Sequence, residues 1–509
     1  MRISLFLFLS FAYTINGFAQ TQDLLSLARG EFLGMNALYD EKENLFGYIS
    51  MYDYGKSGDS TKKFEYVILD KNLNPVANKA FEGDITAGNY AGYINFNGKV
   101  VLRPTYIDYS LVNRKTVFMP SSMEIDLKEN SIQKKVFYEY DHGTFKELLK
   151  HETLMQTRLN DKIEKKENGF NYSASVIEIK EGGYIVLEYD DYIDYQKNNH
   201  IRRYDTSKKE LWDYEYNKTG SKSASELLYP LNKDENYLYG MLRVSAKREE
   251  DKFYLVVVDM KTGKEVHKKE IEAPVNALSH LLRFYTLSYG ELDNDKAFDD
   301  KIVIVGRTSD LYAYTGFSRL IVDKKTFAAD LRTISYMDFK GHIPKISTNG
   351  YVERGFSLDP RDIFIMKDGS VGILFEKYKA AGEYNAQKTT DLVYAYMDKD
   401  FKVAGAKIFE KEKSKWQNSD YLFSQTLNNG NDMVFFYRDY QKDEETKDRN
   451  WNLFINTLIS GTFKQEMIPI SSKENFVIIP YIAKEGYILL QEFNKKAKYN
   501  QVRLERLNY

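Results

Sequence analysis

The residues with the clearest capacity for chemistry lie in a single acidic segment, residues 291–299. Carboxylates and one available backbone carbonyl alternate along it, at Glu291, Asp293, Asp295, Ala297 and Asp299. Such alternation can wrap hard oxygen ligands around one point, which is the coordination that Ca²⁺ prefers. Lys296 interrupts the pattern, and its cation opposes metal binding. Two interpretations therefore stay open: a calcium loop and an acidic, solvated loop.

The sequence contains few other residue patterns that indicate catalysis. The chain has no Cys, which excludes disulfides, thiolate metal sites and cysteine nucleophiles. The six histidines are scattered, without the short spacing of metal ligands. A pair of carboxylates for glycoside hydrolysis is defined by separation in space, so acidic residues such as Asp190, Asp191 and Asp194 do not identify one.

The elements that would position these residues are strands. Residues 253–271 contain an apolar β-branched run, a turn led by Asp259 and closed by Gly263, and a charged second run, which together predict a β-hairpin. The aspartate can accept hydrogen bonds from the turn backbone, and glycine tolerates a positive φ. The same strand–turn–strand pattern recurs along the chain, with turn aspartates at Asp70, Asp126, Asp205, Asp259, Asp323 and Asp398.

Each of these hairpins supplies the third and fourth strands of a longer unit. Extended segments recur in groups of four, and this repetition predicts an all-β propeller. We count eight four-stranded blades, with seven as the alternative. The last unit is one strand short, and residues 23–30 are the candidate to complete it. Residues 145–168 have the apolar spacing of an inserted surface helix. The competing architecture is a tandem of β-sandwiches, which also gives many short strands.

Two of the hairpins support the propeller interpretation further. Residues 203–212 and 257–266 resemble the Asp, Thr-Gly, Trp repeat of quinoprotein-type propellers, with Trp212 in the docking position. The family's cofactor residues are not recognisable here, so the resemblance implies the fold and not a quinone. The acidic segment 291–299 resembles the calcium loops of integrin-type propeller repeats, apart from Lys296 in place of their Gly. The whole chain is similar to uncharacterised exported bacterial propeller-like proteins.

Composition and the N-terminal segment indicate where the protein acts. Arg2, an apolar run over residues 5–9 and the small residues around Ala19 predict a signal peptide over residues 1–19, with Gln20 as the mature N-terminus. We therefore expect one propeller domain over residues 20–509, exported to the periplasm, the outer surface or the medium. No other stretch is apolar enough to predict a transmembrane segment, and a net charge of −2 gives no indication of nucleic-acid binding.

These observations favour an exported, non-enzymatic binding or scaffold protein that uses one propeller face to hold a protein, peptide or glycan of the cell envelope. Tyr-rich segments that include Tyr189, Tyr192, Tyr195, Tyr312 and Tyr314 offer flat rings for such a face, although Tyr is also a common strand residue. The alternative is a glycoside hydrolase or lyase with carboxylates near the central channel. A structural envelope protein without a small ligand is the third hypothesis. No cofactor is indicated other than Ca²⁺.

The two interpretations of residues 291–299 predict different responses to calcium. A calcium loop predicts that Ca²⁺ raises the melting temperature of the protein and that EDTA reverses the rise, because a ligand that binds only the folded state stabilises it. The rise should disappear in a variant that carries Asp293→Ala and Asp295→Ala. A thermal-shift assay measures both effects, and an unchanged melting temperature in the unsubstituted protein would exclude the calcium loop.

Overall fold

The computed structural model describes residues 21–40, 44–59, 61–84, 87–95, 98–107, 116–118, 121–136, 172–179, 183–189, 200–205, 207, 209–216, 224–246, 249–272, 284–286, 290–292, 295–310, 313–382, 386–415, 419–442, 445–470 and 476–508. The predicted signal peptide, residues 1–19, and the predicted helical insertion, residues 145–168, lie outside these ranges. Among the described residues, the elements are strands and short 3-10 helices. None of the helices in these ranges has the length and apolar character needed to cross a bilayer.

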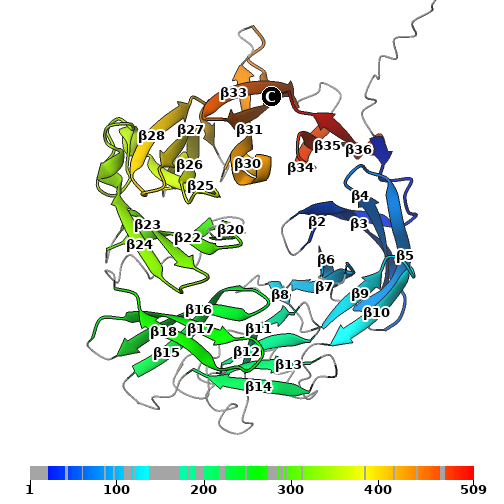
Figure 1. Cartoon of the computed structure of the whole chain (residues 1–509). Coiled ribbons are helices and arrows are strands. Elements are labelled where there is room, and N and C mark those ends of the chain that lie inside the picture. Colours follow the sequence, from blue (N-terminus) through cyan, green and yellow to red (C-terminus); the bar gives the residue numbers. More distant parts are fainter. Residues whose placement is uncertain are drawn as a thin grey trace, which may run out of the picture.

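Eight antiparallel sheets stand around a ring, and each is built on four strands (Figure 1). The predicted eight-bladed propeller is therefore confirmed. Blades 1 to 4 comprise β2 (Glu31–Tyr39), β3 (Leu45–Lys56), β4 (Thr61–Asp70) and β5 (Pro75–Asp84); β6 (Ala87–Ile94), β7 (Val100–Ile107), β9 (Ser121–Asp126) and β10 (Ser131–Val136); β11 (Tyr172–Glu178), β12 (Tyr184–Tyr189), β13 (His200–Tyr204) and β14 (Glu210–Glu215); β15 (Ala224–Lys233), β16 (Tyr237–Ala246), β17 (Lys252–Asp259) and β18 (Glu265–Glu270).

The second half of the ring repeats this order. Blades 5 to 8 comprise β21 (Asp295–Ala297), β22 (Lys301–Ser309), β23 (Tyr314–Asp323) and β24 (Ala329–Ser335); β25 (Ser357–Ile365), β26 (Val371–Lys379), β27 (Lys388–Met397) and β28 (Val403–Phe409); β30 (Tyr421–Leu427), β31 (Asp432–Lys442), β32 (Arg449–Ile459) and β33 (Thr462–Pro469); β34 (Val477–Ile482), β35 (Tyr487–Asn494), β36 (Tyr499–Arg506) and β1 (Thr21–Asp23). The additional elements are β8 (Thr116–Phe118), β19 (Phe284–Thr286), β20 (Gly290–Leu292), β29 (Ser414–Lys415), η2 (Tyr336–Phe339), η3 (Glu353–Gly355) and η4 (Asn428–Gly430).

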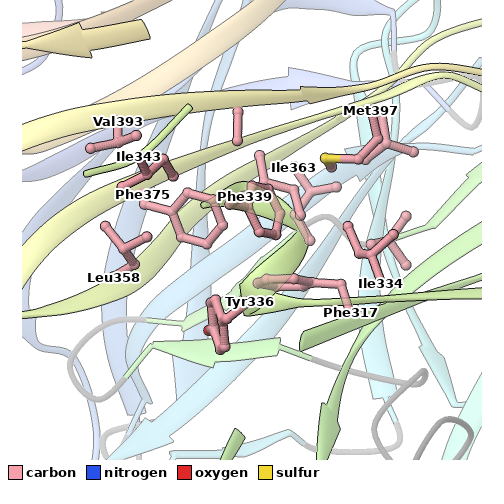
Figure 2. Packing of buried hydrophobic residues seen from close by; sticks show 14 of the residues in the cluster. Phe317, Ile334, Tyr336, Phe339, Ile343, Leu358, Ile363, Phe375, Val393 and Met397 are labelled. Atoms are coloured by element: carbon pink, nitrogen blue, oxygen red, sulfur yellow. The ribbon is translucent and has the colours of Figure 1, made fainter. Parts of the chain in front are cut away.

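The core of the molecule lies between neighbouring blades. Seven clusters of buried apolar side chains fill the contacts between blades 1 and 2, 3 and 4, 4 and 5, 5 and 6, 6 and 7, 7 and 8, and 8 and 1. Figure 2 shows the cluster between blades 5 and 6, where Phe317 of β23 lies close to Phe375 of β26. Since the middle strands of a blade pack on both faces, they read as unbroken apolar runs, whereas outer strands such as β18 are charged and exposed.

The turn aspartates organise the hairpins as predicted. The Asp259 carboxylate accepts hydrogen bonds from the backbone N–H groups of Lys261 and Thr262, at 3.0 and 2.8 Å. The N–H and the hydroxyl of Thr262 hold the pKa of this carboxyl below its usual value. Equivalent backbone bonds reach Asp70, Asp126, Asp205, Asp323 and Asp398. These carboxylates therefore stabilise the turns.

Blade 7 lacks a turn aspartate, and another residue replaces it. Its third hairpin turns through Ser460 and Gly461, both at positive φ, which is the backbone of a two-residue primed turn. The N–H of Ser460 donates at 2.8 Å to Asp432, which lies in the neighbouring strand β31.

Several of these turns also contact the preceding blade. Trp212 of blade 3 is buried and donates its indole N–H to the carbonyl of Met260, in the turn of blade 4, at 2.9 Å. Gly263 has φ +68°, and a Cβ built there would lie 2.7 Å from the Trp212 ring. The predicted docking position of Trp212 and positive φ of Gly263 are confirmed. Elsewhere the turn supplies the apolar side chain instead, at Leu73, Phe327 and Phe401, each also at positive φ.

Arginines from third strands reinforce these contacts. Arg203 donates to the carbonyl of Met260, and Arg319, whose side chain is fully buried, donates to the carbonyl of Lys399 at 2.9 Å. Each carbonyl belongs to the residue that follows a turn aspartate. The two arginines therefore bind equivalent points of the next blade, so the repeat extends to interblade hydrogen bonds.

The ring closes through an N-terminal strand, as predicted, but this strand is shorter and lies earlier than residues 23–30. β1 pairs antiparallel with β36, where Thr21 faces Arg503 and Asp23 faces Gln501. The strand ends at Asp23 because its carboxylate accepts the N–H of Leu25 at 3.0 Å and turns the chain. Leu24 is fully buried, and its carbonyl accepts the Tyr52 hydroxyl at 2.7 Å, which fixes the closing strand to blade 1.

The contact between Trp212 and Gly263 predicts the effect of a single methyl group. Gly461→Ala is the matched control, because Gly461 also has a positive φ but nothing lies within 4 Å of the added Cβ. We expect Gly461→Ala to cost about 1 kcal/mol of unfolding free energy from backbone strain alone. Gly263→Ala should cost about 2 kcal/mol more, because the Trp212 ring must move. Urea unfolding measures both values, and equal losses would contradict the docking role.

Candidate binding face

The blade topology divides the surface of the ring into two faces. At one end, the first strand of every blade begins and the second strand ends, and we call this end the first-strand face. The turns between third and fourth strands lie at the opposite end, which we call the hairpin face. The hairpin face carries the repeated turn aspartates and is therefore constrained by blade docking. The first-strand face carries connections of different length and sequence, where functional residues concentrate on rigid scaffolds.

Exposed apolar side chains gather at the first-strand face. Among the described residues, the large exposed apolar side chains at this face are Leu25, Leu33, Tyr54, Tyr314, Met337, Tyr351 and Val477. The others, Val76, Leu211, Val266 and Met467, lie on outermost strands. Tyr351 is the most exposed of them, at 52%. Exposed aromatic rings that converge on one face are a feature of binding surfaces.

One group of these residues crosses the contact between blades 5 and 6. The Arg307 guanidinium lies 4.4 Å from the centre of the Tyr314 ring, which is a cation–π contact. The same guanidinium pairs at 3.1 Å with Asp359, at the start of the first strand of blade 6. Burial raises the pKa of the Tyr336 hydroxyl to about 12. The positive charge of Arg307 lowers this pKa, and the negative charge of Asp359 raises it. The Tyr336 ring packs against Phe317 in the core between blades 5 and 6.

The connection over residues 336–356 lies above this group and is anchored along its length. Its apolar side chains are buried in the core between blades 5 and 6, where Figure 2 shows Tyr336, Phe339 and Ile343 against Phe317 and Phe375. Gly350 packs so closely on the Tyr336 ring that a Cβ there would lie 2.6 Å from it. The connection therefore presents the exposed Tyr351 from a fixed backbone.

A depression of about 570 Å³ marks the same face beside the closing strand. It is lined by residues 25–30 together with Tyr54 and Glu65. The Tyr54 hydroxyl donates to the Glu65 carboxylate and accepts the N–H of Arg29 at 3.1 Å. Because residues 25–30 follow β1 directly, closure of the ring positions one wall of this depression.

A chain of buried charges lies between blades 6 and 7 near the first-strand face. Glu376 accepts the N–H of Asp420 at 3.0 Å and pairs with Arg361 at 3.1 Å. Lys411 pairs with Asp420 at 2.6 Å, and the side chains of Glu376, Asp420 and Lys411 are all fully buried. Burial raises the pKa of the Glu376 carboxyl, and Arg361 and Lys411 oppose this rise.

This chain of charges bears on the hydrolase alternative. Burial also raises the pKa of Asp439, which accepts backbone N–H groups of Glu412 and Tyr440. Among the described residues, Glu376 and Asp439 are the carboxyls with a raised pKa, and both are buried. A general acid must reach its substrate. Their positions therefore suit interblade stabilisation rather than acid catalysis.

The predicted calcium segment is divided between two sheets. Glu291 lies in β20, Asp295 and Ala297 lie in β21 opposite Ile304 and Ile302, and Asp299 is exposed in the bend that follows. Asp293 lies outside the described residues. Within the described ranges, no three His, Cys, Asp or Glu side chains group closely enough to hold a metal ion. Calcium binding at this segment stays a prediction.

The other predicted residues have separate positions. Tyr314 lies on the first-strand face, Tyr189 lies in β12, and Tyr192, Tyr195 and Tyr312 fall outside the described residues. Asp190, Asp191 and Asp194 also fall outside them. His200 bonds Asp213 at 2.6 Å, and His267 packs on Phe327. Tyr351, Arg307 and the buried charges were not predicted from the sequence, because their relation depends on strand ends that meet across blades.

The buried charges predict a large effect of a single substitution. Lys411→Met removes an ammonium group next to Asp420 and Glu376, and we expect it to cost about 3 kcal/mol of unfolding free energy at neutral pH. A carboxyl whose folded-state pKa is raised binds its proton before the unfolded chain does, so stability rises as the pH falls through that pKa. The loss should therefore shrink on acidification.

Urea unfolding of the variant at pH values from neutral to mildly acidic measures this prediction. Lys442→Met is the control, because Lys442 forms an exposed pair with Glu412 at 3.9 Å and should cost less than about 1 kcal/mol. Equal losses for the two variants would show that the buried charges do not stabilise the ring.

Comparisons with known proteins assign neither a family nor a function. No family model and no curated protein matches the sequence. Among solved structures, the chain is similar to the β-propeller domain of the trilobed protease from Pyrococcus furiosus, with 12% identity, coverage of 85% of this chain and 96% of that one, and a TM-score of 0.31. It is also similar to a europium-containing methanol dehydrogenase, with 10% identity, coverage of 83% of this chain and 80% of that one, and a TM-score of 0.33. A third similar structure is the WD40 domain of SCAP from fission yeast, with 9% identity, coverage of 82% of this chain and 90% of that one, and a TM-score of 0.25. Identities and scores this low carry no argument about function.

Proposed function

We propose that this protein is an exported, non-enzymatic binding protein that holds a protein, peptide or glycan on the first-strand face of its propeller. The observation that carries the proposal is the distribution of exposed apolar side chains, which gather at this face and otherwise occupy outermost strands. The connection that presents Met337 and Tyr351 rests on buried anchors, so this part of the face is preorganised and a ligand orders little on binding there.

The proposal that the protein is exported rests on the predicted signal peptide, residues 1–19. Cleavage after Ala19 would leave Thr21, the first residue of the closing strand, next to the new N-terminus. The predicted processing is thus compatible with an intact eighth blade. Ca²⁺ at residues 291–299 would stabilise the segment by which the chain enters blade 5, because this segment includes the first strand, β21.

The proposal is tested by selecting ligands without assuming their identity. The purified protein is screened against a phage-displayed peptide library and a glycan array. Selected ligands are then titrated against a first-strand variant, Tyr54→Ser with Tyr314→Ser and Tyr351→Ser, and against an outer-strand variant, Leu211→Ser with Val266→Ser. Both variants remove exposed apolar side chains.

We expect the first-strand variant to bind about tenfold more weakly, because truncated aromatic contacts account for much of the binding energy at such surfaces. The outer-strand variant should bind like the unsubstituted protein. Ligands that bind both variants equally well, or a screen that selects no ligand, would contradict the proposal.

A further inference from the structure

We infer that the connection over residues 336–356 is a docking site for an acidic polypeptide segment, an inference that rests on the proposed use of the first-strand face. The connection joins β24 of blade 5 to β25 of blade 6, so both of its ends lie at that face. The connection combines unbalanced charges, a strained backbone conformation and exposed apolar side chains.

The acidic residues of the connection are already engaged. Asp338 accepts the N–H and the hydroxyl of Ser335 at 2.7 and 2.9 Å. Glu353 pairs with the buried Lys377. The exposed cations at this place are Lys340, Lys345, Arg354 and Lys379, and none of them forms an ion pair within the described part of the chain. The surface therefore carries uncompensated positive charge, which complements an acidic partner.

Two of these cations have a strained backbone conformation, which the exposed Lys447 and Lys498 of blades 7 and 8 share. Lys345 has φ +59° and Arg354 has φ +57°, which is the left-handed conformation that favours glycine and asparagine. Both side chains are exposed, so neither compensates for this strain by filling the core. Strained residues that persist on a surface often take part in binding. Here the conformation directs two cationic side chains outward from an anchored connection.

Exposed apolar side chains lie close to these cations. The ring of Tyr336 packs on Gly350, so their chain neighbours Met337 and Tyr351 come from adjoining parts of the connection, with exposures of 37% and 52%. A surface that combines Tyr, Met and Arg with a polar rim has the composition of protein interfaces. Met adapts its shape to an apolar partner side chain. This combination favours a polypeptide over a polysaccharide as the occupant.

The test measures binding of a fluorescein-labelled glutamate homopeptide by anisotropy, with an uncharged Gly–Ser peptide as the control ligand. The test variant carries Lys345→Gly and Arg354→Gly. The control variant carries Lys447→Gly and Lys498→Gly, which remove two exposed lysines at φ +62° and +50° on blades 7 and 8. The two variants therefore make the same change of charge and the same change of backbone strain at different places.

We expect the glutamate peptide to bind, added salt to weaken it, and the test variant to lose about tenfold in affinity. The melting temperature of the test variant should stay the same or rise, because glycine relieves the left-handed strain. The control variant should keep its affinity. A separate Tyr351→Ser variant should bind more weakly without any change in salt dependence.

Three results would overturn the inference. Equal losses in the test and control variants would show general electrostatic attraction. Alginate binding that depends on Lys345 and Arg354, without binding of the glutamate peptide, would assign the surface to an acidic polysaccharide. Failure of the glutamate peptide to bind, while ligands selected from the library still require Tyr54, Tyr314 and Tyr351, would reject this inference and leave the proposed binding function standing.

Discussion

Packing between the faces of neighbouring blades is the interaction on which this structure depends. Seven interblade clusters hold the buried apolar side chains, so each of these contacts covers apolar surface that a separate blade would expose to water. The turns at the hairpin face reinforce this packing through Trp212 against Gly263 and through Arg319 on a carbonyl of the next blade. A chain without Cys can obtain its stability in this way, because area buried between sheets replaces covalent links.

This arrangement separates the parts that must stay constant from the parts that can vary. The hairpin face takes part in docking blades, which explains why its turns repeat one pattern with an aspartate at the start. The connections at the first-strand face have only to bridge one blade to the next. Residues 336–356 use this freedom to carry exposed charges and rings above a buried anchor. Function is therefore most easily accommodated at the first-strand face.

The repeated elements could be predicted from the sequence, and the contacts between distant blades could not. The hairpin around Asp259, the positive φ of Gly263 and the docked Trp212 follow from local turn chemistry, and the blade number follows from their repetition. A closing N-terminal strand was predicted, but its predicted position, residues 23–30, lies too far along the chain. The turn at Asp23 that ends the strand has no distinctive sequence. The buried pairing of Lys411 with Asp420 and Glu376 joins residues from separate strands and loops, so no spacing reveals it.

The closing strand also has a consequence for the order of folding. β1 lies at the start of the described chain and pairs with β36 near its end, so these contacts span almost the entire sequence. Contacts of such sequence separation form late, because the entropy of closing the intervening loop must be overcome first. Blades in the middle can pair with neighbours as soon as both exist, whereas the eighth sheet must wait for both ends of the chain. Until then, the outer edge of β36 lacks its partner, and this open edge is the point at which a folding chain would be most prone to pair with another molecule.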